Sequence, residues 1–212
     1  MCFNYKTSLL NFVLGTIGSL VLIKYGNPKF KSDNTAFGIF GIFIACIQLM
    51  DFLFWIDLRN KIGINHIMTI FGPLLNVGQP IILYIIKLLY FVPKKMDSIN
   101  LSVAVLNGLY MLYLLQMYYT FITTEKNLTT TTKHGHLDWS WLKYANPYFY
   151  LILFAINIFY LTNFNYSLLF FIITYFLLYL SIKFFSYSPG QLWCFFSSSI
   201  PIFMIICSHL LL

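Results

Sequence analysis

The chain has 212 residues, of which 59% are hydrophobic and only 9% are charged. Soluble domains carry about 25% charged residues, and a chain this short has too little interior to hide so much apolar surface from water. The net charge of +7 comes from 13 basic and 6 acidic residues scattered between apolar runs. This scatter suits membrane headgroups and lacks the basic stripe typical of nucleic-acid binding, so we expect an integral, multi-pass membrane protein with no nucleic-acid partner.

The apolar runs predict about seven membrane-spanning helices, because a hydrocarbon core of about 30 Å needs roughly 20 mainly apolar residues in a helix. The predicted helices cover about residues 8–24, 36–56, 66–91, 99–121, 147–162, 166–185 and 189–211, and the fifth is the shortest. The first has a long apolar region, and no small-residue cleavage site follows it, so we expect it to span rather than to act as a signal peptide. The sequence thus predicts an all-α fold, with residues 1–212 forming a single transmembrane domain.

Two of these helices have clear sequence signals at one end. The stretch "GNPKFKSD" (26–33) is rich in turn-forming residues and follows the first helix. Asn146 precedes Pro147, which places a capping residue before a proline at the first helical position. This pair indicates the start of the fifth helix.

A long polar segment, about 122–146, separates the fourth and fifth helices. We expect its threonine run to be flexible. Its second part contains Trp139, Trp141 and Tyr144, whose amphipathic rings favour the depth of the lipid headgroups. The segment is therefore predicted to lie at the membrane interface.

The same segment holds the pattern H-x-H-x-D, formed by His134, His136 and Asp138. Alternate residues of an extended segment could bind a metal, but no fourth ligand accompanies them. A solvated interfacial cluster is the simpler interpretation, with pH sensing as another alternative. The four cysteines form no C-x-x-C pair, so neither a disulfide framework nor a zinc site is predicted, and we expect no cofactor.

The orientation in the membrane depends on opposing signals. Lys24, Lys29 and Lys31 follow the first helix, against Lys6 alone before it, and basic residues favour the cytoplasmic side. This predicts that the N-terminus lies outside. Most of the other basic residues then also lie outside, which opposes the prediction, whereas the sequon at Asn127 would be on the lumenal side that glycosylation requires.

Asp51 is the most informative residue, because it lies within the apolar run "IACIQLMDFLFWID" (44–57), about 9 Å from the helix end. A carboxylate at that depth is costly, and an ionisable residue inside a membrane helix is a functional-site hypothesis by default. At about 100° per residue, Gln48, Asp51 and Trp55 share one helix face. Asp57 points away from them and lies at the helix end.

The third predicted helix offers polar partners for Asp51. Asn76 and Gln79 lie on one face, about 60° apart, and the short loop before this helix makes it antiparallel to the second. Gln48 and Asn76 then both lie about 15 Å deep. We expect the four groups to converge near the midplane, where either the amides donate hydrogen bonds to the carboxylate or Asp51 is protonated, because burial disfavours the charged form of a carboxyl group. Lys87 shares the Asn76 face and is expected to snorkel to the far interface.

The last predicted helix contains "SSSIP" at 197–201. Pro201 has no N–H for the carbonyl of Ser197, so we expect the helix to kink there. Ser197, Ser198 and Ser199 surround the break, and carbonyls and hydroxyls at mid-membrane can coordinate a cation or bind a polar solute. The alternative for these serines and for the amides is structural, since such groups also hold membrane helices together at about 0.6–2 kcal/mol each.

Several short stretches suggest a family. The opening "MCF", "QLMDFLFW" (48–55), "GQPI" (78–81), "HLDW" (136–139) and "GQLWCFF" (190–196) with Pro201 together resemble an uncharacterised multi-pass, seven-helix membrane family of large DNA viruses and marine microbes. The resemblance implies no established activity, substrate or catalytic residue. It suggests a viral protein placed in a host cell membrane.

We therefore expect a small transporter or channel for a proton, a cation or a small polar solute, with Asp51 as the titratable or coordinating group. The supporting residues would be Gln48, Asn76 and Gln79, which orient Asp51, and Ser197, Ser198, Ser199 and Pro201, which line the path. Two alternatives stay open: a membrane-embedded lipid-modifying enzyme with Asp51 as acid or base, and a non-catalytic protein that organises membrane. The expected partners are the lipid bilayer and the ion or solute, with a homo-oligomer as an open alternative.

Overall fold

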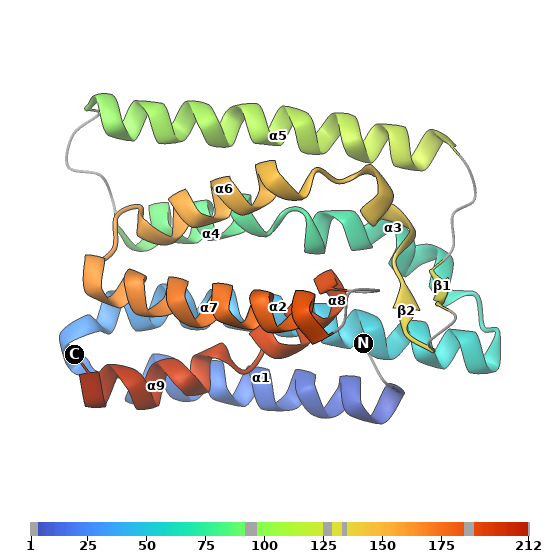
Figure 1. Ribbon diagram of the computed structural model, residues 1–212, viewed down its shortest axis with the longest axis horizontal. Coiled ribbons are helices and arrows are strands. Elements are labelled where there is room, and N and C mark those ends of the chain that lie inside the picture. Colours follow the sequence, from blue (N-terminus) through green and yellow to red (C-terminus); the bar gives the residue numbers. More distant parts are fainter. Residues whose placement is uncertain (1–3, 92–96, 125–128, 133–134, 185–188, 212) are drawn as a thin grey trace.

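The computed structural model describes residues 4–91, 97–124, 129–132, 135–184 and 189–211. Asn127 and His134 lie outside these residues. The described chain is almost entirely helical, which confirms the all-α prediction, and its long helices run side by side along one axis (Figure 1). The helices are α1 (Tyr5–Tyr25), α2 (Lys31–Asn60), α3 (Ile64–Asn76), α4 (Gln79–Tyr90), α5 (Ser98–Thr124), α6 (Pro147–Phe159), α7 (Phe164–Phe184), α8 (Pro189–Ser197) and α9 (Ile200–Leu211). The short elements are the 3₁₀ turns η1 (Pro28–Phe30) and η2 (Ser140–Tyr144) and the strands β1 (Thr130–Thr131) and β2 (Leu137–Asp138).

Helix α2 forms the centre of the bundle. Half of its most apolar window is buried, against 28% in α1 and in α7 and 22% in α5. Small residues let α1 and α9 approach it closely, because a Cβ added to Gly41 would lie 2.5 Å from the Ser19 hydroxyl of α1 and 2.8 Å from the ring of Pro201. Close backbone approach through small residues is a common way to join membrane helices.

Among the described residues, four helices are long and apolar enough to cross a membrane: α1, α2 with η1, α5 and α7. The bent pair α3–α4 makes a fifth if it counts as one span. Helices α6 and α9 are apolar but shorter. The multi-helix membrane fold is therefore supported, whereas the predicted count of seven spans is not confirmed.

Two predicted helices are interrupted. The run 66–91, expected as one helix, is divided into α3 and α4, which meet at 58° across Val77 and Gly78. Pro80 has no N–H to continue the backbone hydrogen bonds of α3, which accounts for the break in the predicted helix. The run 189–211 is divided into α8 and α9 at Ser198 and Ser199, so the helix is interrupted just before Pro201, where we expected a kink.

The polar segment after α5 is folded back against the bundle. Its described part, residues 129–132 and 135–146, is here called the cover segment, and it begins as a two-stranded antiparallel hairpin of β1 and β2. Trp139 and Trp141 are 1% and 0% exposed and stack at 5.3 Å between ring centres, so both rings pack inside the protein, and their predicted depth at the lipid headgroups stays a prediction. Gly72 of α3 leaves room for Trp141, since a Cβ there would lie 2.3 Å from its ring.

The same segment is also held by its backbone. Asn65 of α3 donates to the carbonyl of Thr129 at 2.7 Å and accepts from its N–H at 3.1 Å. Thr69 adds a hydroxyl contact with Thr129 at 3.2 Å. These bonds satisfy the buried backbone N–H and C=O groups of Thr129 and attach the start of the segment to α3. The described part of the threonine run is therefore ordered against α3.

Candidate functional site

The carboxyl group of Asp51 is fully buried in α2, and the indole N–H of Trp139 donates to its Oδ1 at 3.0 Å. An N–H bond to a carboxylate is among the stronger hydrogen bonds in proteins. The cover segment thus supplies a partner that we did not predict, because Trp139 was assigned to the interface. A signal did exist: a buried indole needs an acceptor for its N–H, and Asp51 needs donors.

Asn76 and Gln79 flank the break between α3 and α4, and both turn toward α8. The amide nitrogen of Asn76 lies 3.4 Å from the sulfur of Cys194, and that of Gln79 lies 3.8 Å from it. Cys194 is also close enough to Asp51 to interact with it electrostatically. Asn76 and Gln79 therefore meet at a thiol that the sequence presented only as a small apolar residue, and the predicted convergence of all four polar groups near the midplane stays a prediction.

Two further groups complete this buried site. Gln48, fully buried, lies one helical turn before Asp51 on α2. The hydroxyl of Tyr150, from α6, donates to the side-chain oxygen of Gln79 at 2.5 Å. We call Asp51, Gln48, Asn76, Gln79, Cys194, Trp139 and Tyr150 the Asp51 site.

The serine break is more self-contained than expected. The hydroxyl of Ser198 donates to the carbonyl of Phe195 at 2.8 Å, and that of Ser199 donates to the carbonyl of Phe196 at 2.6 Å. Both therefore satisfy their own helix end. The hydroxyl of Ser197 is buried and has no hydrogen-bond partner among the described residues.

The break also packs against neighbouring helices. A Cβ added to Gly15 of α1 would meet the Ser198 side chain at 3.0 Å, and one added to Gly41 of α2 would meet Pro201 at 2.8 Å. Cys194, one turn before the break, is the α8 residue that joins Asn76 and Gln79. The contribution of this helix to the Asp51 site thus comes chiefly from Cys194.

A cavity of about 410 Å³ adjoins the site, between the cover segment, α6, α7 and α8. Asp138 and Asn146, both exposed, lie on its outer part, whereas the mostly buried Asn76 and Tyr150 line its inner part. The cavity therefore connects the bundle end that carries the cover segment with two residues of the Asp51 site.

The H-x-H-x-D pattern is spread over the hairpin. His136 is half-buried, Asp138 is exposed on β2, and His134 lies outside the described residues. Within the part of the chain that the structure describes, no group of three or more histidines, cysteines or acidic residues could hold a metal ion.

A second buried charge lies toward the other end of the bundle. Lys87 of α4 is 0% exposed, so its predicted snorkelling is wrong. Its ammonium group donates to the carbonyl of Ile158 at 2.5 Å and to the hydroxyl of Thr162 at 3.0 Å, and lies 4.8 Å from the ring centre of Phe37. It also interacts electrostatically with Asp33 near the start of α2.

Asp33 is itself held in place. It is 6% exposed and accepts from the backbone N–H of Asn163 at 3.1 Å. We call Lys87, Asp33, Phe37, Ile158 and Thr162 the Lys87 site. Asp33 and Asp51 are about 27 Å apart along α2, so the two buried charges belong to separate regions.

No protein-family model, curated protein or solved structure matches this chain. The resemblance to a family of viral and marine membrane proteins therefore stays a prediction. The function has to be argued from the residues and geometry of the chain itself.

Proposed function

We propose that this protein is a small membrane transporter or channel for a proton, a cation or a small polar solute, with Asp51 as its titratable or coordinating group. The observation that carries the proposal is a buried carboxylate beside two interrupted helices. The α3–α4 break is flanked by Asn76 and Gln79, and the α8–α9 break follows Cys194 by one turn. Interrupted helices with polar groups near mid-membrane form the ion and substrate sites of many transporters.

The partners of the amide groups support this proposal. A thiol is a weak hydrogen-bond acceptor, so the bonds from Asn76 and Gln79 to Cys194 are weak ones. A solute oxygen or a water molecule can take the place of the sulfur at little cost. The amides can therefore change partners while Trp139 keeps Asp51 in position.

The cavity supplies an approach to the site. Its volume of about 410 Å³ is within the range of small-molecule sites, and its lining becomes less exposed from Asp138 to Asn76. A small polar solute or a file of water entering from the cover-segment end would meet Asn76 and Tyr150 first. Asp51 is not part of the cavity lining, but it is close enough to Cys194 to interact with it electrostatically.

The proposal includes seven traverses, with α6 and the α8–α9 pair added to the five candidate spans, and an outside N-terminus. The cover segment and the mouth of the cavity then face outward. Cysteines introduced at the exposed positions Thr130 and Lys24 test this. An impermeant maleimide should label Thr130→Cys in sealed cells and Lys24→Cys only after permeabilisation. The opposite pattern inverts the topology.

The function is tested by flux in reconstituted vesicles, measured against pH and with several cations for the wild type and Asp51→Asn. The amide keeps the volume and can still accept from Trp139, but it cannot ionise. We expect the variant to fold with a similar melting temperature and to lose pH-dependent or cation-dependent flux.

Asp57→Asn is the matched control, because Asp57 is a carboxylate of the same helix that accepts from the backbone N–H of Ile64 at 2.9 Å, a role that an amide can take over. Equal flux curves for the wild type and Asp51→Asn would exclude Asp51 as the functional group. Absence of flux from the wild type would favour a lipid-modifying enzyme or a membrane-organising protein.

A further inference from the structure

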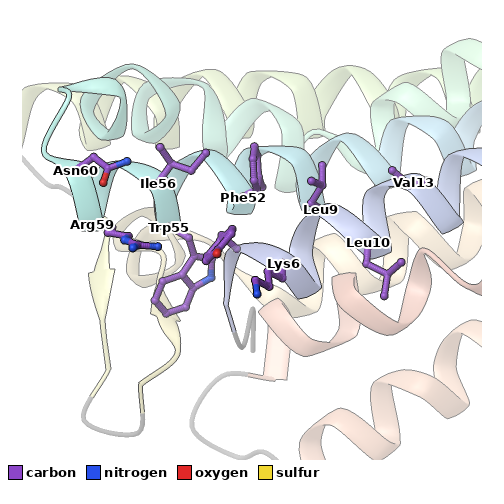
Figure 2. A pocket seen from close by; sticks show the side chains of 10 residues that line it. Lys6, Leu9, Leu10, Val13, Phe52, Trp55, Ile56, Arg59 and Asn60 are labelled. Atoms are coloured by element: carbon purple, nitrogen blue, oxygen red, sulfur yellow. The ribbon is translucent and has the colours of Figure 1, made fainter.

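A groove of about 650 Å³ runs between α1 and the last turns of α2, and its lining does not include the residues of the Asp51 site, although Trp55 follows Asp51 by one helical turn. Figure 2 shows its walls, with Leu9 and Val13 on α1 and Phe52 and Trp55 on α2. Lys6 and Arg59 line it where the two helices reach the end of the bundle. The groove is thus apolar along most of its length and cationic at one end.

The two cations lie near one aromatic ring. The ammonium nitrogen of Lys6 and the guanidinium carbon of Arg59 each lie 6.0 Å from the ring centre of Tyr5. Among the described residues, neither forms an ion pair. The carboxylate of Asp57, also on α2, is 8% exposed, accepts from the N–H of Ile64 and is not among the residues that line the groove.

Trp55 gives an independent sign of a missing partner. Its indole nitrogen is buried in the groove wall and has no hydrogen-bond partner among the described residues. Buried indole N–H groups usually find an acceptor. An oxygen-rich ligand in the groove would supply one beside the two cations.

We propose that this groove binds a membrane phospholipid with an anionic headgroup. The headgroup phosphate lies between Lys6 and Arg59, and one acyl chain follows Leu9, Val13 and Phe52 toward the membrane interior. Arginine suits phosphate because its planar donors can form two parallel bonds. Tyr5 and Trp55 are the amphipathic rings that favour headgroup depth.

This inference does not depend on the proposed transport function. It concerns the outer surface of the α1–α2 pair, and it would hold equally for an enzyme or a membrane-organising protein.

The test uses quenching of tryptophan fluorescence by brominated lipids. Trp139, Trp141 and Trp193 are at most 6% exposed, so quenching by dibrominated acyl chains reports chiefly on Trp55, and Trp55→Phe gives the background. Wild-type protein is reconstituted in phosphatidylcholine vesicles with increasing dibromo-phosphatidylglycerol, and separately with dibromo-phosphatidylcholine. We expect the anionic lipid to be favoured several-fold.

The double variant Lys6→Gln with Arg59→Gln should abolish this preference, so that the two brominated lipids quench Trp55 about equally. Its circular dichroism spectrum should be unchanged. Lys24→Gln is the matched control, because Lys24 is an exposed lysine at the other end of α1 that also lies over a tyrosine ring, at 5.1 Å. It should keep the wild-type preference. Equal quenching by both lipids in the wild type, a preference that survives in the double variant, or an equal loss in Lys24→Gln would each overturn the proposal.

Discussion

The Asp51 site and the Lys87 site both bury an ionisable side chain, but the partners that surround this side chain differ between the two sites. The Lys87 ammonium contacts the carbonyl of Ile158, the hydroxyl of Thr162 and the ring face of Phe37. The negative charge of Asp33 compensates its positive charge. It sits within an uninterrupted stretch of α4. Asp51 has a strong bond from Trp139, while the amides around it bind a thiol beside two helix breaks and a cavity. Burial of a charged side chain does not by itself indicate function. A functional site is indicated when the neighbouring polar groups can exchange their hydrogen-bond partners.

Removal of Lys87 should have the largest effect on stability. Lys87→Met keeps much of the side-chain volume but leaves the buried Asp33 without a compensating charge, which we expect to cost about 3 kcal/mol or more. The measurement is thermal or denaturant unfolding in detergent. Adding Asp33→Asn should recover part of the loss, because the unpaired charge is then gone. If the Lys87→Met protein were as stable as the wild type, the Lys87 site could not be the structural counterpart of the Asp51 site.

Trp139→Phe should have the next largest effect, because it removes the N–H donor to Asp51 while keeping an aromatic ring. Loss of a hydrogen bond to a charged group costs about 1.5–3 kcal/mol. Trp193→Phe is the control: its indole N–H donates to the neutral carbonyl of Thr174 at 3.0 Å, so it should cost less by roughly 1 kcal/mol. Equal destabilisation by the two substitutions would mean that Asp51 is neutral or that its bond is weak.

Asn107→Ala tests polar groups that belong to neither site. Asn107 of α5 and Asn157 of α6 exchange two side-chain hydrogen bonds of 3.1 and 2.8 Å, and Asn157 also donates to the carbonyl of Pro80. This pair joins helices, so we expect a loss of about 1 kcal/mol in stability and unchanged flux. A flux defect in a protein that still folds would extend the functional region beyond the Asp51 site.

Cys194→Ser should have the smallest effect on stability and yet affect flux. A hydroxyl is a better acceptor than a thiol, so it should hold the amides of Asn76 and Gln79 more firmly. We expect a melting temperature near that of the wild type and flux reduced several-fold. Unchanged flux would show that exchange at Cys194 is not part of the mechanism.

Local sequence rules predicted much of the fold. All the described helices fall within or close to the seven predicted runs, and the Asn146 cap is as expected, since its side chain accepts from the N–H groups of Tyr148 and Phe149. The α3–α4 break was missed because the run is apolar on both sides of it, although Gly78 and Pro80 mark the place. Apolar length indicates where a segment can span and does not indicate where its backbone bends.

The site was predicted only where helical periodicity sufficed. The shared faces of Gln48 with Asp51 and of Asn76 with Gln79 follow from 3.6 residues per turn. Cys194 and Trp139 come from distant segments, and nothing local to them indicates which helix they meet. Lys87 shows the same limit, because its position near a helix end is visible in the sequence, whereas the side of the helix that faces protein rather than lipid is not.

The bond between Trp139 and Asp51 also has a consequence for biosynthesis. The ribosome makes Asp51 88 residues before its indole partner, so if α2 spans a membrane it would have to insert while that partner does not yet exist. An aspartate costs about 2.5–3.5 kcal/mol on insertion scales at the centre of an inserting helix, and Asp51, which lies nearer the end of α2, costs less than this. The apolar remainder of α2 and its close contact with the earlier α1 have to hold the helix in place during that interval. Early stability of the first two helices is thus a condition for the later completion of the Asp51 site.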